Sequence, residues 1–135
     1  MKIRNYKDED FPQLIKLLEE SGVIWKLTDN RESLNKKIEF EPESIIVAEE
    51  EGKIIGTIFL IFDPWCSFIH HAAVDKDYRR KGIGDILGQM AEQRLKARGA
   101  KVVCGFVKEG NPELLEIYKR RGCSASKVFF MIKSL

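Results

Sequence analysis

Hydrophobic residues near the start of the chain recur at the spacing of one helix face. We expect a short strand over 2–6 and then a helix that ends at Gly22, a residue suited to the left-handed position after a helix. The segment 23–42 is weakly periodic and predicts a loop followed by a short helix. The residues that define the first helix are Phe11, Leu14, Ile15 and Leu18.

After Pro42 the pattern changes to short apolar runs rich in β-branched residues, separated by turn signals at Gly52 and Pro64. Runs of this length joined by short turns are typical of an antiparallel meander. The three predicted strands cover 44–48, 53–62 and 67–74.

The second half of the chain combines helical stripes with two further strand patterns. One helix is expected to end at Gly99, and another to begin at Asn111 and Pro112 and end at Gly122. The expected elements are a helix over 82–98, with Ile83, Ile86, Leu87, Met90 and Leu95 on its apolar stripe, a strand over 101–107, a helix over 111–122 and a strand over 128–133.

These elements predict an α/β fold. A chain of 135 residues with 44% hydrophobic residues has the size and apolar content of one compact domain, spanning 1–135. The central sheet is expected to be mixed and, because the middle strands form a meander, mostly antiparallel, with about four flanking helices and a short C-terminal strand region.

Composition and charge disfavour several classes of partner. The 23 Lys and Arg residues and 21 Asp and Glu residues leave a net charge of +2, which is too small to favour nucleic acid or a membrane surface. No apolar run reaches the length of a membrane span and the first residues contain no signal-peptide core, so a soluble cytoplasmic protein is expected. Cys66, Cys104 and Cys123 lack metal-binding spacing and are expected to be free thiols, with no metal site.

The segment 79–84, RRKGIG, stands between a predicted strand and a predicted helix. The first amides of a helix have no internal partner and lie at the positive end of its dipole, and glycine lets the backbone approach an anion. The segment therefore predicts a phosphate cradle. It contains neither the GxxxxGK[ST] of a P-loop nor a complete GxGxxG, so ATP and dinucleotide binding are disfavoured.

The spacing RxxGxG, formed by Arg79, Gly82 and Gly84, follows a strand that ends at Val74 and opens an apolar-striped helix. This arrangement resembles the acetyl-CoA signature of the GNAT superfamily of N-acetyltransferases. The order of elements over 2–122 is also similar: after the next strand, that family has an asparagine that opens a helix, then a tyrosine and then a glycine. The matching residues here are Asn111, Tyr118 and Gly122.

The resemblance implies that the protein uses acetyl-CoA as a co-substrate. The pyrophosphate would meet the backbone amides of 79–85, with glycine at two positions because a side chain there would hold the phosphate away. The pantetheine arm would pair with 72–74 like an added strand, and the amide of Ala72 would face the thioester oxygen. The implied cofactor-binding residues are Ala72, Ala73, Val74, Arg79, Arg80, Lys81, Gly82, Ile83, Gly84, Asp85, Asn111 and Tyr118.

By the same resemblance, Tyr118 is the candidate general acid that donates a proton to the leaving sulfur. A phenol with a pKa of about 10 is a weak acid, but a thiolate with a pKa of about 8.5 needs only a nearby donor as its charge develops. The alternative is that Tyr118 merely packs against Leu114 on the same helix face. Asn111 can both cap that helix and contact the cofactor.

Several groups compete for the role of general base. Some family members carry a glutamate two places into the fourth or fifth strand, whereas the matching positions here are Phe68 and Phe106. His70 and His71 are substitutes, because an imidazole with a pKa of about 6.5 accepts a proton near neutral pH. Strand alternation is expected to send their rings to opposite faces, so that at most one enters the cleft. Deprotonation through ordered water, with no single base, is the alternative.

Two features bear on the acceptor and on assembly. Trp25 and Trp65 either line an acceptor pocket or fill the core. The family commonly ends in a two-strand hairpin after its last helix, whereas 123–135 leaves room for one strand. We therefore expect a homodimer in which a neighbouring subunit completes the acceptor wall.

The function that the resemblance implies is transfer of an acetyl group from acetyl-CoA to a primary amine, by direct attack in a ternary complex. A protein N-terminus, a lysine, a polyamine, an aminoglycoside and an amino acid all stay open as acceptors. The alternative is a non-catalytic acyl-CoA-binding or regulatory module, which Phe68 and Phe106 favour and Tyr118 disfavours. An unrelated phosphate-binding fold would require the spacing of Asn111 and Tyr118 to be a coincidence.

Overall fold

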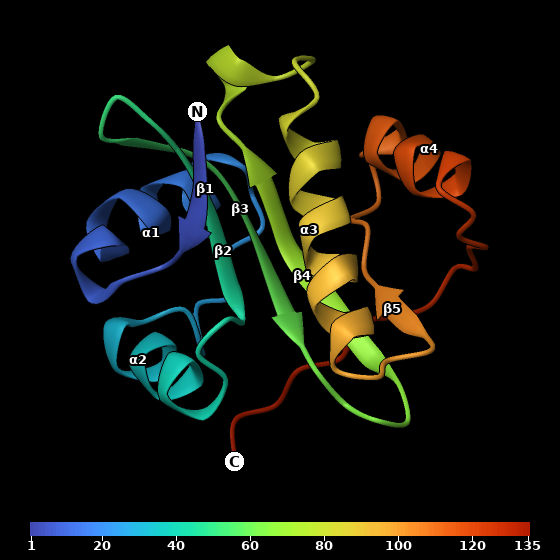
Figure 1. The fold of residues 1–135 in the computed structure, drawn as a ribbon. Helices are drawn as coiled ribbons and strands as arrows, with labels where there is room; N and C mark the ends of the chain where they lie inside the picture. Colours follow the sequence, from blue (N-terminus) through green and yellow to red (C-terminus); the bar gives the residue numbers. More distant parts are fainter.

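The structure, a computed structural model, describes residues 1–135. Its centre is a five-stranded sheet with the order β1-β2-β3-β4-β5, and helices cover both of its faces (Figure 1). The strands are β1 (Lys2–Asn5), β2 (Ile45–Glu50), β3 (Lys53–Ile61), β4 (Ser67–Val74) and β5 (Val103–Gly105). The helices are α1 (Phe11–Glu20), α2 (Arg31–Phe40), α3 (Ile83–Ala97) and α4 (Pro112–Arg120), with the short 3₁₀ helices η1 (Asp8–Asp10) and η2 (Lys76–Tyr78).

The sheet is mixed and mostly antiparallel, as predicted. β1 to β4 form antiparallel ladders, which include the predicted meander, whereas β4 and β5 are parallel. Parallel neighbours need a long crossover connection, and α3 lies in that connection. The predicted α/β class and single central sheet are confirmed.

Two hydrophobic clusters hold the helices on opposite faces of the sheet. One contains Leu14 of α1 and Phe59 of β3, and the other contains Leu87 of α3. Ile45 and Ile46 are adjacent on β2 but belong to different clusters, because successive strand residues point to opposite faces. Figure 1 accordingly shows α1 and α2 on one side of the sheet and α3, with α4 beside it, on the other.

The predicted apolar stripe of α3 is correct at Ile83, Leu87 and Leu95, which are buried against the sheet, and Met90 packs at its edge. Ile86 was wrongly included, since it is 39% exposed. The buried residues of α3 recur every four positions. Ile86 is three positions after Ile83 and therefore lies to one side of the buried stripe.

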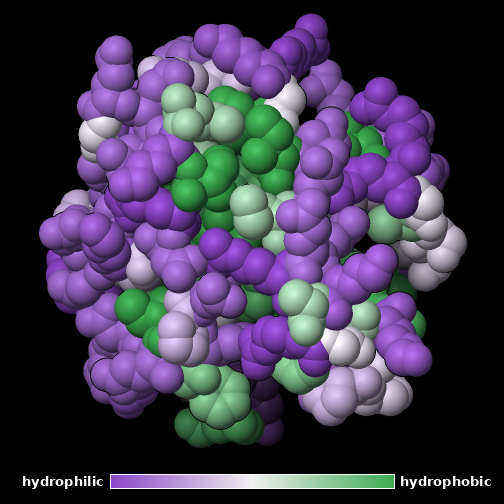
Figure 2. Space-filling model, in the orientation of Figure 1, coloured by the Kyte–Doolittle hydropathy of each residue, from purple (hydrophilic) through white to green (hydrophobic).

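The outer surface over α3 is mainly hydrophilic. Figure 2 shows hydrophobic side chains gathered over the strands beside the first turns of α3 and hydrophilic ones over most of the remaining face. None of the helices combines the length and the hydropathy that a membrane span requires.

The strand predicted over 128–133 is absent. Residues 123–135 have no regular structure and Phe129 is 96% exposed. The strand predicted over 101–107 is reduced to Val103–Gly105. An apolar run favours a strand only where a neighbouring edge can pair with it, and β5, with three residues, offers a very short edge.

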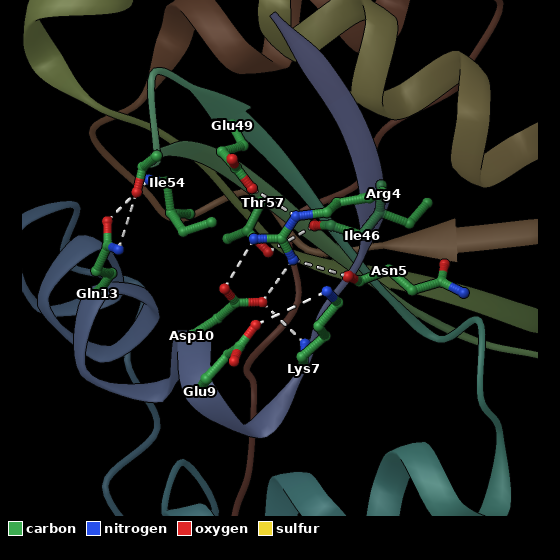
Figure 3. A network of polar contacts seen from close by, with 11 residues as sticks. Arg4, Asn5, Lys7, Glu9, Asp10, Gln13, Ile46, Glu49, Ile54 and Thr57 are labelled. Atoms are coloured by element: carbon green, nitrogen blue, oxygen red, sulfur yellow. Dashed lines mark hydrogen bonds and ion pairs between the residues drawn. The ribbon is translucent and has the colours of Figure 1, made fainter.

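An ion-pair network joins β1, η1 and β2 (Figure 3). The guanidinium of Arg4 donates to both carboxylate oxygens of Asp10, at 2.7 and 2.8 Å, and to Glu49 at 2.6 Å. Asp10 also accepts from the backbone amide of Lys7 at 2.8 Å. Burial opposes the charge on Asp10, but the hydrogen bonds from Arg4 and Lys7 outweigh it and hold the pKa of Asp10 below its usual value. The network therefore fixes the start of α1 against the sheet.

Candidate active site

β4 and β5 separate part of the way along their length. Their parallel ladder stops at Ile69 and Gly105, whereas β4 continues to Val74 while paired with β3 on its other side. The stretch 70–74 therefore presents a main-chain edge with no strand beside it. An extended ligand that carries amide groups fits such an edge.

The predicted phosphate cradle lies where the end of β4 leads into α3. Gly82 caps α3 with a φ of +80°, a left-handed conformation that glycine adopts without strain. A Cβ on Gly82 would meet no atom within 4 Å, so that side of the loop is open. The first helical hydrogen bond runs from the amide of Ile86 to the carbonyl of Gly82 at 3.1 Å, which leaves the amides of 83–85 for a ligand. The arrangement suits an anion.

Three residues of this loop are exposed cations: Arg79, Arg80 and Lys81. Nε of Arg79 donates to the carbonyl of Val74 at 3.0 Å and ties the loop back to the end of β4. Arg80 has a φ of +61°, and its guanidinium lies 3.1 Å from the carboxylate of Glu113 in the first turn of α4. The basic loop thus links α3 to α4.

Helix α4 packs beside α3. Nη2 of Arg121, at the end of α4, lies 2.7 Å from Oε1 of Glu92, and Nη1 donates to the carbonyl of Asp85 at 3.2 Å. Tyr118 packs against the same hydrophobic cluster as Ala72, so the phenol and the free edge of β4 share one face of the sheet. Burial raises the pKa of Tyr118, which keeps the phenol protonated as a donor.

Asn111 has the capping position that its sequence context predicts. Its Oδ1 accepts a hydrogen bond from the amide of Leu114 at 3.2 Å, and Pro112 follows as the first residue of α4. The Asn111 side chain is exposed, on the connection between β5 and α4.

His70 and His71 lie on the same face of the sheet, so the prediction of opposite faces was wrong. The ladder pairs Phe59 with His70 and then, two residues away on β3, pairs Thr57 with Ala73. His71 and Ala72 of β4 therefore oppose the single residue Ile58 of β3, which is a β-bulge, and His71 has a φ of +53°. The extra residue interrupts the alternation and turns both rings toward α1 and α2.

The two imidazole rings form a chain of contacts with Asp29. Nε2 of His71 lies 2.7 Å from Oδ2 of Asp29, and the Nδ1 atoms of His70 and His71 are 2.9 Å apart. Nε2 of His70 is buried and has no hydrogen-bond partner. Burial, assisted by His71 and Lys37, lowers the pKa of His70 to about 3, so this ring is neutral near pH 7.

A pocket of about 280 Å³ lies between these histidines and α2. Trp25 stacks on His70 with ring centroids 5.2 Å apart, and Phe59 stacks on His71 at 4.7 Å. Trp25 therefore lines a pocket. Trp65 does not line this pocket, because it is 83% exposed in the turn between β3 and β4.

The positions that the resemblance matches to a glutamate hold aromatic side chains. Phe68 on β4 and Phe106 after β5 stack with ring centroids 6.2 Å apart, and Phe130 packs on Phe106 at 5.3 Å. These rings form an apolar wall and offer no proton acceptor.

Asp29 is a residue of this site that the sequence did not predict. It is 42 residues from His71 and lies in a loop, so no local spacing links the two.

The three cysteines are free thiols, as predicted, although Sγ of Cys66 lies 2.9 Å from Sγ of Cys104. No group of three or more His, Cys, Asp or Glu side chains is arranged to hold a metal ion.

Known proteins are similar to this chain in sequence and in fold. The model of the acetyltransferase (GNAT) family matches residues 8–123. An acetyltransferase of Pectobacterium atrosepticum is 28% identical over 120 residues, which cover 89% of this chain and 85% of the relative.

Solved structures agree on the fold. Ard1 from Thermoplasma volcanium has a TM-score of 0.82 at 21% identity, over 93% of this chain and 84% of that one. PaiA N-acetyltransferase from Thermoplasma acidophilum, in complex with coenzyme A, has a TM-score of 0.75 at 22% identity, over 89% of this chain and 87% of that one. Because the family model covers most of the sequence, the chain belongs to the acetyltransferase (GNAT) family and is an N-acetyltransferase.

Proposed function

We propose that this N-acetyltransferase acts in the cytoplasm and transfers an acetyl group from acetyl-CoA to a primary amine, by direct attack in a ternary complex. The observation that carries the proposal is the open loop before α3, where the amides of 83–85 have no helical partner and Gly82 leaves space above them. The short helix η2 joins this loop to the strand whose edge is free over 70–74. A phosphate group and an extended amide-bearing arm are the two chemical features of coenzyme A that such a surface fits.

The cofactor would lie along the end of β4 and the start of α3. Its pyrophosphate would bind the amides of 79–85, with Arg79, Arg80 and Lys81 supplying positive charge. The pantetheine arm would pair with 72–74, and the amide of Ala72 would donate to the thioester oxygen as negative charge develops there. The PaiA relative, solved with coenzyme A, supports this choice of cofactor.

In the reaction, the amine nitrogen attacks the thioester carbon, a C–N bond forms and the C–S bond breaks. The amine gives up one proton to a base, and the departing thiolate receives one from the phenol of Tyr118. Tyr118 suits this role because its burial beside the free edge of β4 keeps it protonated. Asn111, which caps α4, would contact the cofactor from the same helix.

The acceptor amine would enter through the pocket lined by Trp25, His70 and His71. This pocket lies on the α1 and α2 face, whereas Tyr118 and Ala72 pack on the α3 face. The ladder between β4 and β5 ends at Ile69, and cofactor and acceptor would meet beyond this point, each approaching from its own face of the sheet. Protein N-termini, lysine, polyamines, aminoglycosides and amino acids are the acceptors to screen.

A second candidate is a non-catalytic acyl-CoA-binding module. The stacked rings of Phe68 and Phe106 favour it, because they leave no carboxylate base in that part of the cleft. Calorimetric titration with acetyl-CoA, followed by thiol-release assays with the panel of amines, separates the two functions. Binding with amine-dependent release supports the transferase, and binding without release by any amine favours the module.

We also propose that the protein forms a homodimer. Val128, Phe129 and Met131 are exposed apolar residues in a segment without a strand partner, and a second copy would cover them. Light scattering at micromolar concentration should give the dimer mass, and a monomer mass would contradict this proposal.

A further inference from the structure

The contacts of Asp29, His71 and His70 restrict which ring nitrogens carry protons. The carboxylate of Asp29 can only accept, so Nε2 of His71 carries a proton and donates it across 2.7 Å. When His71 is neutral, its Nδ1 has a lone pair, and the 2.9 Å contact between the two Nδ1 atoms then requires His70 to be the donor. Neutral His70 is left with its lone pair on Nε2, the buried atom that has no partner.

We propose that His70 is the catalytic base of this enzyme and that His71 and Asp29 form a relay which carries the proton away from it. The proposal rests on the proposed function, because it assigns the base for that same acetyl transfer. His70 is the catalytic residue, since it touches the acceptor amine. His71 and Asp29 are positioning residues.

The relay moves protons without changing their number. As the C–N bond forms, the amine proton passes to Nε2 of His70 and the proton on Nδ1 of His70 passes to Nδ1 of His71. His71 then carries both ring protons, and its positive charge lies against the carboxylate of Asp29. The thiolate receives its proton from Tyr118, on the opposite face. After product release, the relay returns its proton and Tyr118 regains one through solvent.

The surroundings explain why the charge belongs on His71 rather than His70. His70 is buried among aromatic rings, and the charge of Lys37 on α2 acts on it; both disfavour a positive charge there. Lys37 is itself held by the carbonyl of Leu60 at 2.8 Å and by Glu41 at 3.8 Å. Asp29, from the loop before α2, is the carboxylate that contacts the imidazole pair directly. A proton that His70 takes up is therefore more stable after its transfer to His71.

The local backbone is difficult to explain as packing alone. His71 adopts a left-handed φ of +53° within a strand, a conformation that residues other than glycine rarely adopt. The bulge places two imidazole rings against Trp25 and Phe59 and leaves a buried nitrogen without a partner, which folded proteins usually avoid. Strain and an unsatisfied polar atom at the same place are typical of a functional site.

Access to His70 requires an aromatic side chain to move. Trp25 stacks on His70, and Phe130 stacks on Trp25 with ring centroids 4.8 Å apart. These rings exclude water from the lone pair on Nε2, and an amine that enters the pocket displaces them and becomes its partner. Exclusion of competing water strengthens proton transfer along the relay.

The relay is tested first by its protonation pattern. The chain has two histidines, so a long-range ¹H–¹⁵N correlation spectrum of the wild-type protein near pH 7 contains only these rings. We expect an unprotonated Nε2 in His70 and an unprotonated Nδ1 in His71. A protonated Nε2 in His70 would overturn the assignment of His70 as the base, whether or not an acceptor is known.

The second test is kinetic and uses Asp29→Asn, which keeps the side-chain shape but removes the charge. The variant should lower kcat by about 100-fold with little change in the KM for acetyl-CoA. Glu39→Gln, the same chemical change at an exposed position of α2, should leave both constants unchanged. His70→Gln should lose as much as Asp29→Asn, and the double variant should lose little more, because the residues act as one unit.

The outcomes separate this inference from the function on which it rests. No thiol release from the wild-type protein with any amine would overturn the proposed function and the relay together. Release by the wild-type protein that persists unchanged in folded Asp29→Asn or His70→Gln would overturn the relay alone. Circular dichroism and thermal unfolding establish that each variant is folded, and the spectrum of the wild-type protein decides the protonation pattern independently of any variant.

Discussion

His71 on β4 and Asp29 in the loop before α2 are 42 residues apart in sequence, yet Nε2 of His71 lies 2.7 Å from Oδ2 of Asp29. The backbone amide of Trp25 donates to the same carboxylate oxygen at 2.5 Å. The carboxylate thereby joins the α1–α2 loop to the bulge of β4, and it fixes the orientation of the ring that stands beside the pocket. The loop and the strand therefore form one structural unit.

Replacement of Gly82 by glutamate should abolish binding of coenzyme A. The new side chain would place bulk and negative charge over the amides of 83–85, where the pyrophosphate is proposed to bind. Gly52→Glu is a matched control, because Gly52 has a φ of +79° and also has no atom within 4 Å of an added Cβ. Both variants should lose about 1 kcal/mol of stability from backbone strain. Equal affinity for coenzyme A in the two variants, measured by calorimetry, would contradict the cradle.

Replacement of Tyr118 by phenylalanine should lower kcat by about 10-fold to 100-fold and leave affinity for coenzyme A unchanged, because only the donor to the leaving sulfur is removed. Burial raises the pKa of Tyr118, so the phenol keeps its proton to a higher pH than an exposed tyrosine. Below about pH 10, the wild-type kcat should therefore show no decrease that is caused by deprotonation of Tyr118. Steady-state kinetics across pH measure both effects, and an unchanged kcat in Tyr118→Phe would remove the residue from the mechanism.

Replacement of Asp10 by asparagine should lower the free energy of unfolding by about 2 kcal/mol near pH 7, because it weakens two charged hydrogen bonds from Arg4. The folded-state pKa of Asp10 lies below that of the unfolded chain. The contribution of Asp10 to the free energy of unfolding is therefore fully present above about pH 4, and it is lost as the pH falls through the folded-state pKa of Asp10.

Asp8→Asn is the control for that network. Asp8 pairs with Arg31 at 2.6 Å, but both side chains are about half exposed, so solvent screens the pair and the loss should stay below about 1 kcal/mol. Urea unfolding at pH 7 and at pH 3 measures the difference. An Asp10→Asn variant as stable as Asp8→Asn at pH 7 would show that the network contributes little.

Much of the fold follows from local patterns. The apolar spacing of the first helix and of Ile83, Leu87 and Leu95 depends only on helix geometry, and the meander depends only on strand period and turns. The predicted cap at Asn111 was found for the same reason, since a cap acts within one helical turn. These signals need no knowledge of the rest of the chain.

The arrangement of the two histidines could not be predicted from local sequence, because it depends on tertiary contacts. A bulge depends on how many residues of β4 and β3 oppose each other, and the spacing of His70 and His71 alone predicts simple alternation. The partner of His71 comes from an irregular loop with no periodic signal. The strand expected over 128–133 failed for a related reason, because its pattern says nothing about whether an edge is free to pair with it.

The central claim is acetyl transfer from acetyl-CoA to an amine, and the most direct measurement is thiol release from acetyl-CoA with the panel of amines, with products identified by mass spectrometry. We expect at least one amine to be acetylated, with one thiol released for each product, and the rate to fall sharply in Gly82→Glu but not in Gly52→Glu. Tight binding of acetyl-CoA without an acetylated product from any amine would contradict the claim and favour the non-catalytic module.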